Sequence, residues 1–197
     1  MKRLLISASL IVSAVLPSAV HAQAIPAAVV AVVDLEKVTS QCNACKTASA
    51  ALRSQVTGLQ NRQKALVGPL ETEGKAIQAA LDALNGKEPD AALKTRAQTW
   101  ETKRNQAAQE LQRQQQQIQA NQQYVQKQVA DKLGPIYSQV MQRRGANVMV
   151  EIGQTLASGA TLDVTNDVLT ALNTALPTVA TTAPAQAARP QTQPQGR

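Results

Sequence analysis

Two long runs of apolar residues, spaced alternately three and four positions apart, constrain this chain more than any other feature. The first run occupies residues 35–84 and the second residues 93–140. Such heptad spacing places one apolar stripe along each helix and is typical of coiled coils. Residues 85–90 (Asn-Gly-Lys-Glu-Pro-Asp) lie between the runs and favour a turn. The sequence therefore predicts an antiparallel helical hairpin over residues 35–145 with its tip near 85–90, each arm of about 50 residues extending about 75 Å.

Two features should weaken this hairpin. Gly68 and Pro69 stand inside the first arm, where Pro removes a helical hydrogen bond and should kink or soften the helix. Residues 106–128 contain twelve Gln, so the second arm should pack weakly at mid-length. The simplest interpretation of this Gln-rich stretch is a solvated helix face with no role in recognition.

Short β segments are predicted on both sides of the hairpin. Residues 29–33 (Val-Val-Ala-Val-Val) favour a buried strand, residues 147–152 alternate like a second strand, and residues 155–157 predict a weaker third strand. A short helix should follow Thr165 as its N-cap. Residues 175–197, which contain four Pro among Ala, Thr and Gln, should form a disordered tail.

The predicted fold class is mainly α with a small β part. The terminal strands can meet only if the hairpin returns the chain to its start, so residues 28–34 and 146–174 should form one body into which the hairpin is inserted. A body of this size buries little apolar surface, which favours assembly of several subunits.

The composition argues against an enzyme. The single His, His21, lies in the N-terminal leader described next, so the mature chain lacks the usual residue for acid–base chemistry and for most zinc sites. The only aromatic residues are Trp100, Tyr124 and Tyr137, which makes a thick core of packed rings unexpected. We therefore expect no catalytic residues, no cofactor and no metal.

Residues 1–22 resemble a cleaved signal peptide. Lys2 and Arg3 precede an apolar stretch over residues 4–16, and Val20-His21-Ala22 offers a small-residue cleavage site. The alternative is an uncleaved anchor, but the apolar stretch is too short to span a bilayer. We expect a soluble, exported protein in a compartment where disulfides persist.

Three motifs bear on the family of this chain. Residues 33–38 (Val-Asp-Leu-Glu-Lys-Val) follow a V-D-x-x-x-V pattern, residues 134–137 (Gly-Pro-Ile-Tyr) place a Pro-Ile step near the base of the second arm, and residues 163–169 (Asp-Val-Thr-Asn-Asp-Val-Leu) follow a D-I-T-x-D-V-L pattern with Val in place of Ile. Together with the strand at 147–152, they resemble the Skp/OmpH family of periplasmic chaperones over about residues 28–174. The last pattern is the most specific, because heptads alone match any coiled coil.

The resemblance implies a homotrimer in which a small β-barrel body joins three subunits and three helical hairpins surround a cavity. Members of the family hold unfolded outer-membrane proteins in this cavity. It therefore implies an ATP-independent periplasmic holdase that prevents the aggregation of its clients. The strand residues expected to take part in oligomerisation are Val29, Val30, Val32, Val33, Val148 and Val150.

The charge of the predicted arms suits such a cage. Residues 35–145 carry 16 basic and 9 acidic residues, a net charge of +7, which would attract acidic clients and anionic lipid or lipopolysaccharide. A solvated coiled-coil face explains any single cation equally well, so the client-binding residues are predicted only as a group. That group is Lys46, Arg53, Arg62, Lys64, Lys75, Lys94, Arg96, Lys103 and Arg104.

Two other classes of function compete with a chaperone. Nucleic acid is not expected as a partner, because the chain has no aromatic-rich surface and its leader exports it. A coiled-coil structural spacer or envelope adaptor is the stronger alternative, since helical hairpins with disordered tails also serve as tethers. Binding of unfolded clients separates this alternative from a holdase.

Residues 41–46 (Gln-Cys-Asn-Ala-Cys-Lys) depart from the family pattern, in which many relatives have a short turn rich in Ser, Pro and Gly. Residues 35–41 can therefore form a separate short helix, with the long arm beginning near Ala44. A disulfide between Cys42 and Cys45 that closes the turn is the favoured interpretation. A redox-active dithiol and reduced thiols packed in the seam are the alternatives, whereas a zinc site would need two further ligands.

Overall fold

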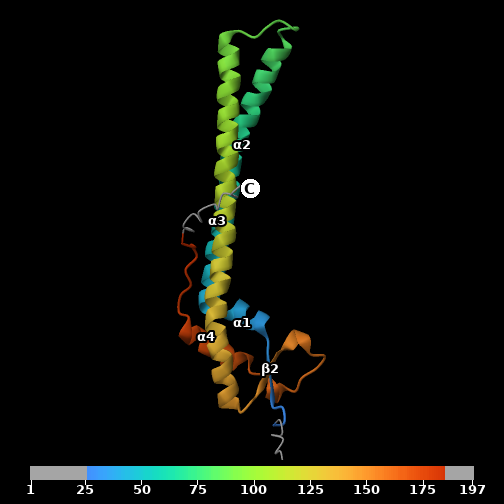
Figure 1. The fold of residues 1–197 in the computed structure, drawn as a ribbon, viewed down its shortest axis with the longest axis vertical. Coiled ribbons are helices and arrows are strands. Elements are labelled where there is room, and N and C mark those ends of the chain that lie inside the picture. The colour runs from blue at the N-terminus through green and yellow to red at the C-terminus, as the bar shows by residue number, and fades with distance from the viewer. Residues whose placement is uncertain (1–25, 185–197) are drawn as a thin grey trace, which may run out of the picture.

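The computed structural model describes residues 26–184. A long helical hairpin rises from a small body (Figure 1). The body contains the first and the last regular elements of the described chain. The predicted leader, residues 1–22, lies outside the described residues. The elements are β1 (Val30–Val33), α1 (Leu35–Gln41), α2 (Asn43–Asp82), α3 (Ala91–Arg144), β2 (Val148–Glu151), the 3₁₀ turns η1 (Ile152–Gln154) and η2 (Ala160–Leu162), and α4 (Thr165–Ala175).

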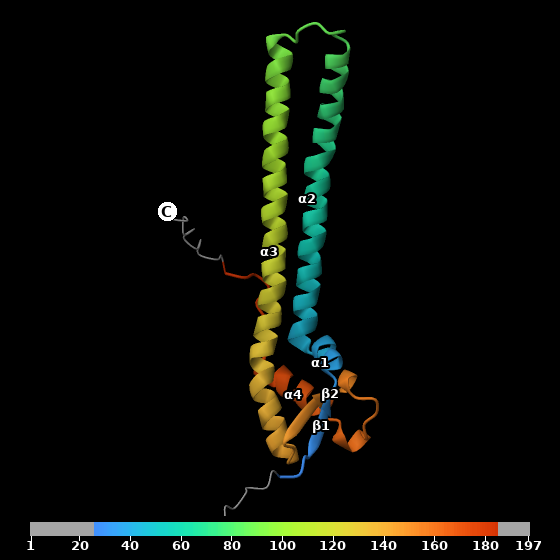
Figure 2. The same cartoon turned by 45° about the vertical axis from the view of Figure 1, so that its right-hand side comes forward.

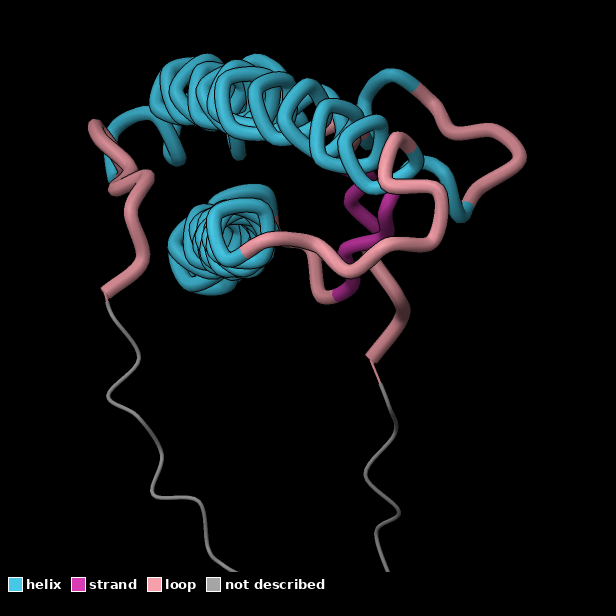
Figure 3. Tube along the Cα trace, turned by 90° about the horizontal axis from the view of Figure 1, so that it is seen from above, coloured by secondary structure: helices cyan, strands magenta, loops and turns pink. Residues whose placement is uncertain are grey.

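Helices α2 and α3 form the two arms of the hairpin (Figure 2). They contain 40 and 54 residues, which at 1.5 Å per residue correspond to lengths of about 60 and about 80 Å. Seen from above, α3 is viewed nearly end-on while α2 is inclined to it (Figure 3). The arms are joined by residues 83–90, where Asn85 and Gly86 adopt left-handed backbone conformations with φ of 47° and 84°. The Lys87 N–H donates to the Leu84 carbonyl at 3.0 Å, so the tip contains a tight turn at residues 84–87.

The ends of α3 have clear physical causes. The side chain of Asp90 accepts a hydrogen bond from the Leu93 backbone N–H at 2.8 Å, which caps the start of the helix. Gly145 ends it with φ of 66°, a conformation that glycine adopts without steric cost. Pro69 lies inside α2, and the helix continues through it without interruption.

A break at Cys42 separates α1 from α2. Cys42 has φ −56° and ψ 128°, so it is extended and ends one helix while capping the next. Its Sγ accepts a hydrogen bond from the Cys45 backbone N–H at 3.2 Å. The continuous heptad through this region is therefore wrong, and the alternative of a separate short helix over residues 35–41 is what the structure has.

The sheet in the body joins the two ends of the sequence. β1 and β2 pair in parallel, with Val30 opposite Val148 and Val33 opposite Glu151. On its other side β1 is covered in part by the segment before α4, because the Val164 N–H donates to the Val32 carbonyl at 2.9 Å. Within residues 26–184, the outer edge of β2 has no strand partner.

The predicted third strand at residues 155–157 is wrong. The chain there is irregular between η1 and η2, and Leu156 is fully exposed. A strand needs a neighbour to pair with, and in this loop only Asp163 forms a β-bridge to β1. The mainly α fold with a small β part is confirmed, and the described chain contributes a two-stranded sheet to its body.

The core lies where α1, α3 and α4 meet the sheet. α4 lies across the base of α3, and its Val168 and Leu172 are fully buried. Arg144 at the end of α3 pairs with Asp167 of α4 at 2.6 Å. The other core residues come from β1, α1, the base of the two arms and the residues that flank α4: Ala31, Val33, Val38, Cys42, Ala44, Cys45, Val129, Leu133, Ile136, Val140, Val164 and Leu176.

Residues 176–184, the first part of the predicted disordered tail, make defined contacts with the body and the arms, whereas residues 185–197 lie outside the described residues. Residues 176–184 run from the body along the hairpin, as the red segment beside α3 shows (Figure 1). Leu176 is buried, Val179 packs against the core, and the backbone beyond them is hydrogen-bonded to side chains of the arms. Composition alone indicated disorder, because the partners of this segment lie far away in the sequence.

Candidate functional site

The hairpin offers a long, exposed surface, held together by a thin seam. Between the base and the tip, only Ile77, Ala107 and Asn121 are buried along its length. Two ion pairs join the arms: Arg62 with Glu110 at 2.7 Å, and Arg96 with Glu73 at 2.6 Å. Small apolar contacts and a few polar links therefore hold the arms side by side.

The two cross-arm ion pairs shift the pKa values of the four side chains that form them. Hydrogen bonds from Arg96 lower the pKa of Glu73, and those from Arg62 lower the pKa of Glu110. The same bonds raise the pKa of each guanidinium. All four groups face solvent, so these pairs fix the alignment of the arms more than they stabilise the fold.

Trp100 links the upper halves of the arms. Its indole N–H donates a hydrogen bond to the Leu70 carbonyl of α2 at 2.7 Å. The ring lies over Gly74, where an added Cβ would be 2.9 Å from Cζ2 of the ring. The guanidinium of Arg104 stands 5.1 Å from the ring centroid, a cation–π distance.

A shallow apolar groove lies beside Trp100. It has a volume of about 250 Å³ and is lined by Val67, Leu70, Trp100, Arg104, Ala107 and Leu111, among others. An open groove of this size offers contact area to an apolar side chain without enclosing a ligand, unlike the enclosed pockets typical of small-molecule sites.

The nine basic residues predicted to bind clients are all exposed. Arg62 and Arg96 are held by the cross-arm ion pairs, Lys94 pairs with Glu88 at 2.6 Å, and Arg104 lies over Trp100. Within the described chain the remaining five make no ion pair. These five, which we call the free cations, are Lys46, Arg53, Lys64, Lys75 and Lys103.

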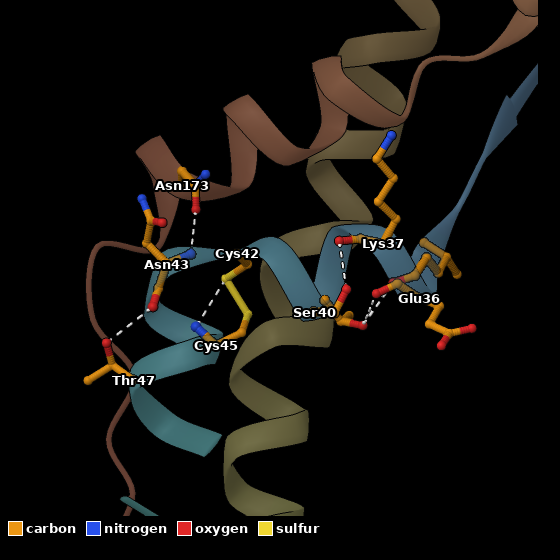
Figure 4. Close-up of a disulfide and its surroundings, with 10 residues drawn as sticks. Glu36, Lys37, Ser40, Cys42, Asn43, Cys45, Thr47 and Asn173 are labelled. Atoms are coloured by element: carbon orange, nitrogen blue, oxygen red, sulfur yellow. Dashed lines mark hydrogen bonds between the residues drawn. A yellow bond between two sulfur atoms is a disulfide. The ribbon is translucent and has the colours of Figure 1, made fainter. Parts of the chain in front are cut away.

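Cys42 and Cys45 are joined by a disulfide at the junction of α1 and α2 (Figure 4). Their Cα atoms are 5.1 Å apart, and both residues belong to the buried core. The Asn43 N–H donates to the Asn173 side chain at 2.9 Å, which ties this junction to α4. A buried disulfide is poorly placed for attack by a substrate thiolate, so the geometry favours a structural bond.

The predicted oligomerisation residues differ in their exposure. Val32 and Val33 are buried inside the protomer, whereas Val29 and Val148 are 49% and 39% exposed. Val30 and Val150 are intermediate. Further exposed apolar side chains, Ile152, Leu156 and Leu162, lie in the loop that follows β2. The apolar surface of the body is thus concentrated around the open edge of β2 and this loop.

Comparison with known protein families identifies this architecture. Residues 29–172 match the family model described as outer membrane protein (OmpH-like). The chain belongs to the OmpH-like family. The resemblance inferred from the three motifs is therefore confirmed, and the match extends from β1 to α4 through the whole hairpin.

A solved structure shows the same fold. The crystal structure of a proposed outer membrane chaperone (OmpH-like) from Caulobacter crescentus CB15 superposes with a TM-score of 0.66. The two chains are 20% identical, and the similarity covers 83% of this chain and 95% of the other. A search of curated proteins found no match.

In residues 26–184, no cluster of three or more His, Cys, Asp or Glu is placed to hold a metal ion. No helix in that range is both long enough and apolar enough to cross a membrane.

Sequence reasoning missed two parts of this surface. The sequence shows Trp100 only as one of three aromatic residues, although a search for a small residue opposite a large one could have paired it with Gly74. The polar residues Gln55, Gln117, Asn121 and Gln128 hold the segment after α4. No local pattern could have found them, because their partners are 52 to 126 residues away in the sequence.

Proposed function

We propose that this protein is an ATP-independent holdase that binds unfolded outer-membrane proteins between its helical arms and prevents their aggregation. The observation that carries the proposal is the hairpin itself: an exposed, net-positive pair of helices that extends far beyond the body and has a thin seam. Such a surface offers many weak contacts and charge attraction, which suit clients of varied sequence and size.

The proposal includes a homotrimer. A two-stranded parallel sheet is unusual in isolation, because parallel sheets are generally covered on both faces. The open edge of β2 and the exposed Val29, Val148 and Leu156 provide surface for pairing with another subunit. Three bodies joined in this way would place three hairpins around a common cavity.

The proposed location is the periplasm, reached through cleavage of residues 1–22. The disulfide between Cys42 and Cys45 is consistent with an oxidising compartment. The free cations would also attract anionic lipid or lipopolysaccharide at the membrane surface.

The test is suppression of aggregation. A urea-unfolded outer-membrane β-barrel protein is diluted into buffer with and without the mature protein, and light scattering is followed without ATP. We expect scattering to fall to near zero once each client chain has one chaperone oligomer. Undiminished scattering, together with binding to one folded partner, would instead support the structural spacer or envelope adaptor.

A further inference from the structure

The segment after α4 is bound to the hairpin by side chains of the arms. Four of these, Gln55 of α2 and Gln117, Asn121 and Gln128 of α3, form what we call the amide clasp. Gln128 donates to the Ala180 carbonyl at 2.8 Å and accepts from the Ala180 N–H at 3.0 Å. One Gln side chain therefore satisfies both main-chain groups of a single residue.

The rest of the clasp repeats this arrangement further along the segment. The Ala183 N–H donates to Asn121 Oδ1 at 2.8 Å, and Gln117 Nε2 lies 3.4 Å from the Ala183 carbonyl. Gln55 Nε2 donates to the Thr181 carbonyl at 3.0 Å. Three of the four residues between 180 and 183 are thus held through the main chain.

All of these hydrogen bonds are made to main-chain atoms of the segment. Within residues 177–184, no side chain forms a hydrogen bond with the arms. Main-chain N–H and C=O groups are present in nearly every residue of a polypeptide. The clasp therefore binds its occupant without hydrogen bonds to side chains, and its binding does not depend on the occupant's sequence. Beyond Val179 the occupant supplies only small side chains, which a different peptide could replace.

The clasp is also ordered by its own hydrogen bonds. Asn121 is 4% exposed, donates to Gln55 Oε1 at 2.8 Å, and accepts from Gln117 Nε2 at 2.8 Å. A buried polar residue at a helix–helix seam is costly unless it is hydrogen-bonded. The Gln-rich stretch of α3 therefore includes a built binding surface and is more than a solvated helix face.

We propose that the amide clasp is a binding site for the main chain of an unfolded polypeptide, and that residues 180–183 occupy it until a client displaces them. The identity of the displacing client rests on the proposed holdase function. The site itself, a sequence-independent acceptor of main-chain amides, does not.

The covalent connection of the segment to α4 explains why a few hydrogen bonds are enough to keep it in the clasp. The segment is attached to α4 only a few residues away, so its effective concentration at the clasp is high and weak contacts keep it bound. A client that touches the arms at many points can outcompete it. If the segment is bound in about nine of ten molecules, its release raises the apparent affinity for a client about tenfold.

Releasing the segment without changing the clasp requires altering the main chain of the segment. The double substitution Ala180→Pro and Ala183→Pro removes the two N–H groups that donate to Gln128 and Asn121. The matched control, Ala180→Ser and Ala183→Ser, keeps both N–H groups. Both variants are made in the full mature chain.

A peptide titration tests the site independently of any chaperone activity. The probe is the eight-residue peptide of residues 177–184, and the side-chain amide signals of Asn121 and Gln128 are followed by NMR. We expect the peptide to shift these signals in the Pro variant at concentrations at least tenfold lower than in the Ser control. A probe N-methylated at the two Ala positions should have no effect. Absence of shifts in the Pro variant, or equal shifts with the N-methylated probe, would overturn the proposal.

Hydrogen exchange in the unaltered protein tests displacement by a client. We expect the Ala180 and Ala183 amides to exchange at least fivefold faster when an unfolded β-barrel protein is bound. Unchanged exchange with the client bound would show that the client does not use the clasp, and would refute its role in client binding. If no client binds at all, the proposed function fails, and the peptide titration still decides whether the clasp binds main chain.

Discussion

At the scale of single residues, the hairpin depends on a large residue placed opposite a small one. Trp100 of α3 reaches the Leu70 carbonyl only because Gly74 leaves room for its ring. The ring in turn supports Arg104 and lines the apolar groove. Apart from Ile77, the buried residues between the base and the tip are the small Ala107 and the polar Asn121, so this contact carries a large share of the stability of the upper hairpin.

Gly74→Ala tests this contact. The added Cβ would lie 2.9 Å from Cζ2 of Trp100, and overpacking of this kind costs about 1–3 kcal/mol. Replacing Gly by Ala in a helix returns about 1 kcal/mol, so we expect a net loss of about 1 kcal/mol in urea unfolding and a shift in Trp fluorescence. Gly68→Ala is the control, because nothing lies within 4 Å of its added Cβ. A Gly74→Ala variant as stable as the control would contradict this account.

Asp163 makes the stability of the body sensitive to acid. Hydrogen bonds from the Thr165 side chain and backbone lower the pKa of Asp163 below its ordinary value of 3.8. A carboxylate with a lowered pKa stabilises the folded state above about pH 4, and this contribution is lost as the pH falls through its folded-state pKa.

The substitution Asp163→Asn isolates that contribution, because Asn can still accept the Thr165 N–H. In urea unfolding we expect the original protein to exceed the variant in stability at pH 6, and this difference to shrink as the pH falls below about 4. Parallel curves over this pH range would show that the charge of Asp163 does not stabilise the fold.

At the scale of elements, local patterns predicted the hairpin and failed where distant contacts decide. The heptads predicted both arms, and the turn residues placed the tip between Asp82 and Ala91. The run of Val at residues 29–33 predicted β1. By contrast, Leu156 lies in a loop because no neighbouring strand is available for it to pair with. Residues 176–184 follow the hairpin because Gln55 and Gln128 bind their main chain.

The candidate site was predictable to a similar degree. The exposed cations follow from helical spacing and composition, and all nine lie on the arms as expected. Which of them are paired could not be predicted, since Arg62 and Glu110 meet only when the two arms are aligned in register. The clasp and the Trp100 contact depend on the same register.

The element that should govern client size is α2. Pro69 cannot donate the helical hydrogen bond at its position, which leaves a weak point next to Gly68. We expect Gly68→Ala combined with Pro69→Ala to stiffen the arm and narrow the range of client sizes that are kept from aggregating. The measurement is scattering with a small and a large barrel protein, and the oligomer mass should not change. An unchanged client range would count against flexible arms.

At the scale of the whole molecule, charge and shape act together. The hairpin carries a net +7 over residues 35–145, and the five free cations are among those that form no ion pair in the described chain. A positive field over a long surface speeds encounters with acidic clients, and salt weakens it because the Debye length falls to about 8 Å at 0.15 M.

Replacing the five free cations by Gln tests this field. We expect client association to slow about tenfold at 50 mM salt and to differ little at 500 mM salt, as measured by stopped-flow fluorescence. The control replaces the four Lys of the group by Arg and retains the charge. Equal slowing in both variants, or slowing that is independent of salt, would argue for lost side-chain contacts rather than a lost field.

The most direct test of the central claim is the mass of the assembly. Light scattering coupled to size exclusion would be measured on the mature protein alone and after a urea-unfolded β-barrel protein is diluted into it. A trimeric holdase predicts a mass of three chains that rises by the mass of one client chain. A monomer, or an oligomer whose mass stays fixed while the client aggregates, would contradict the account.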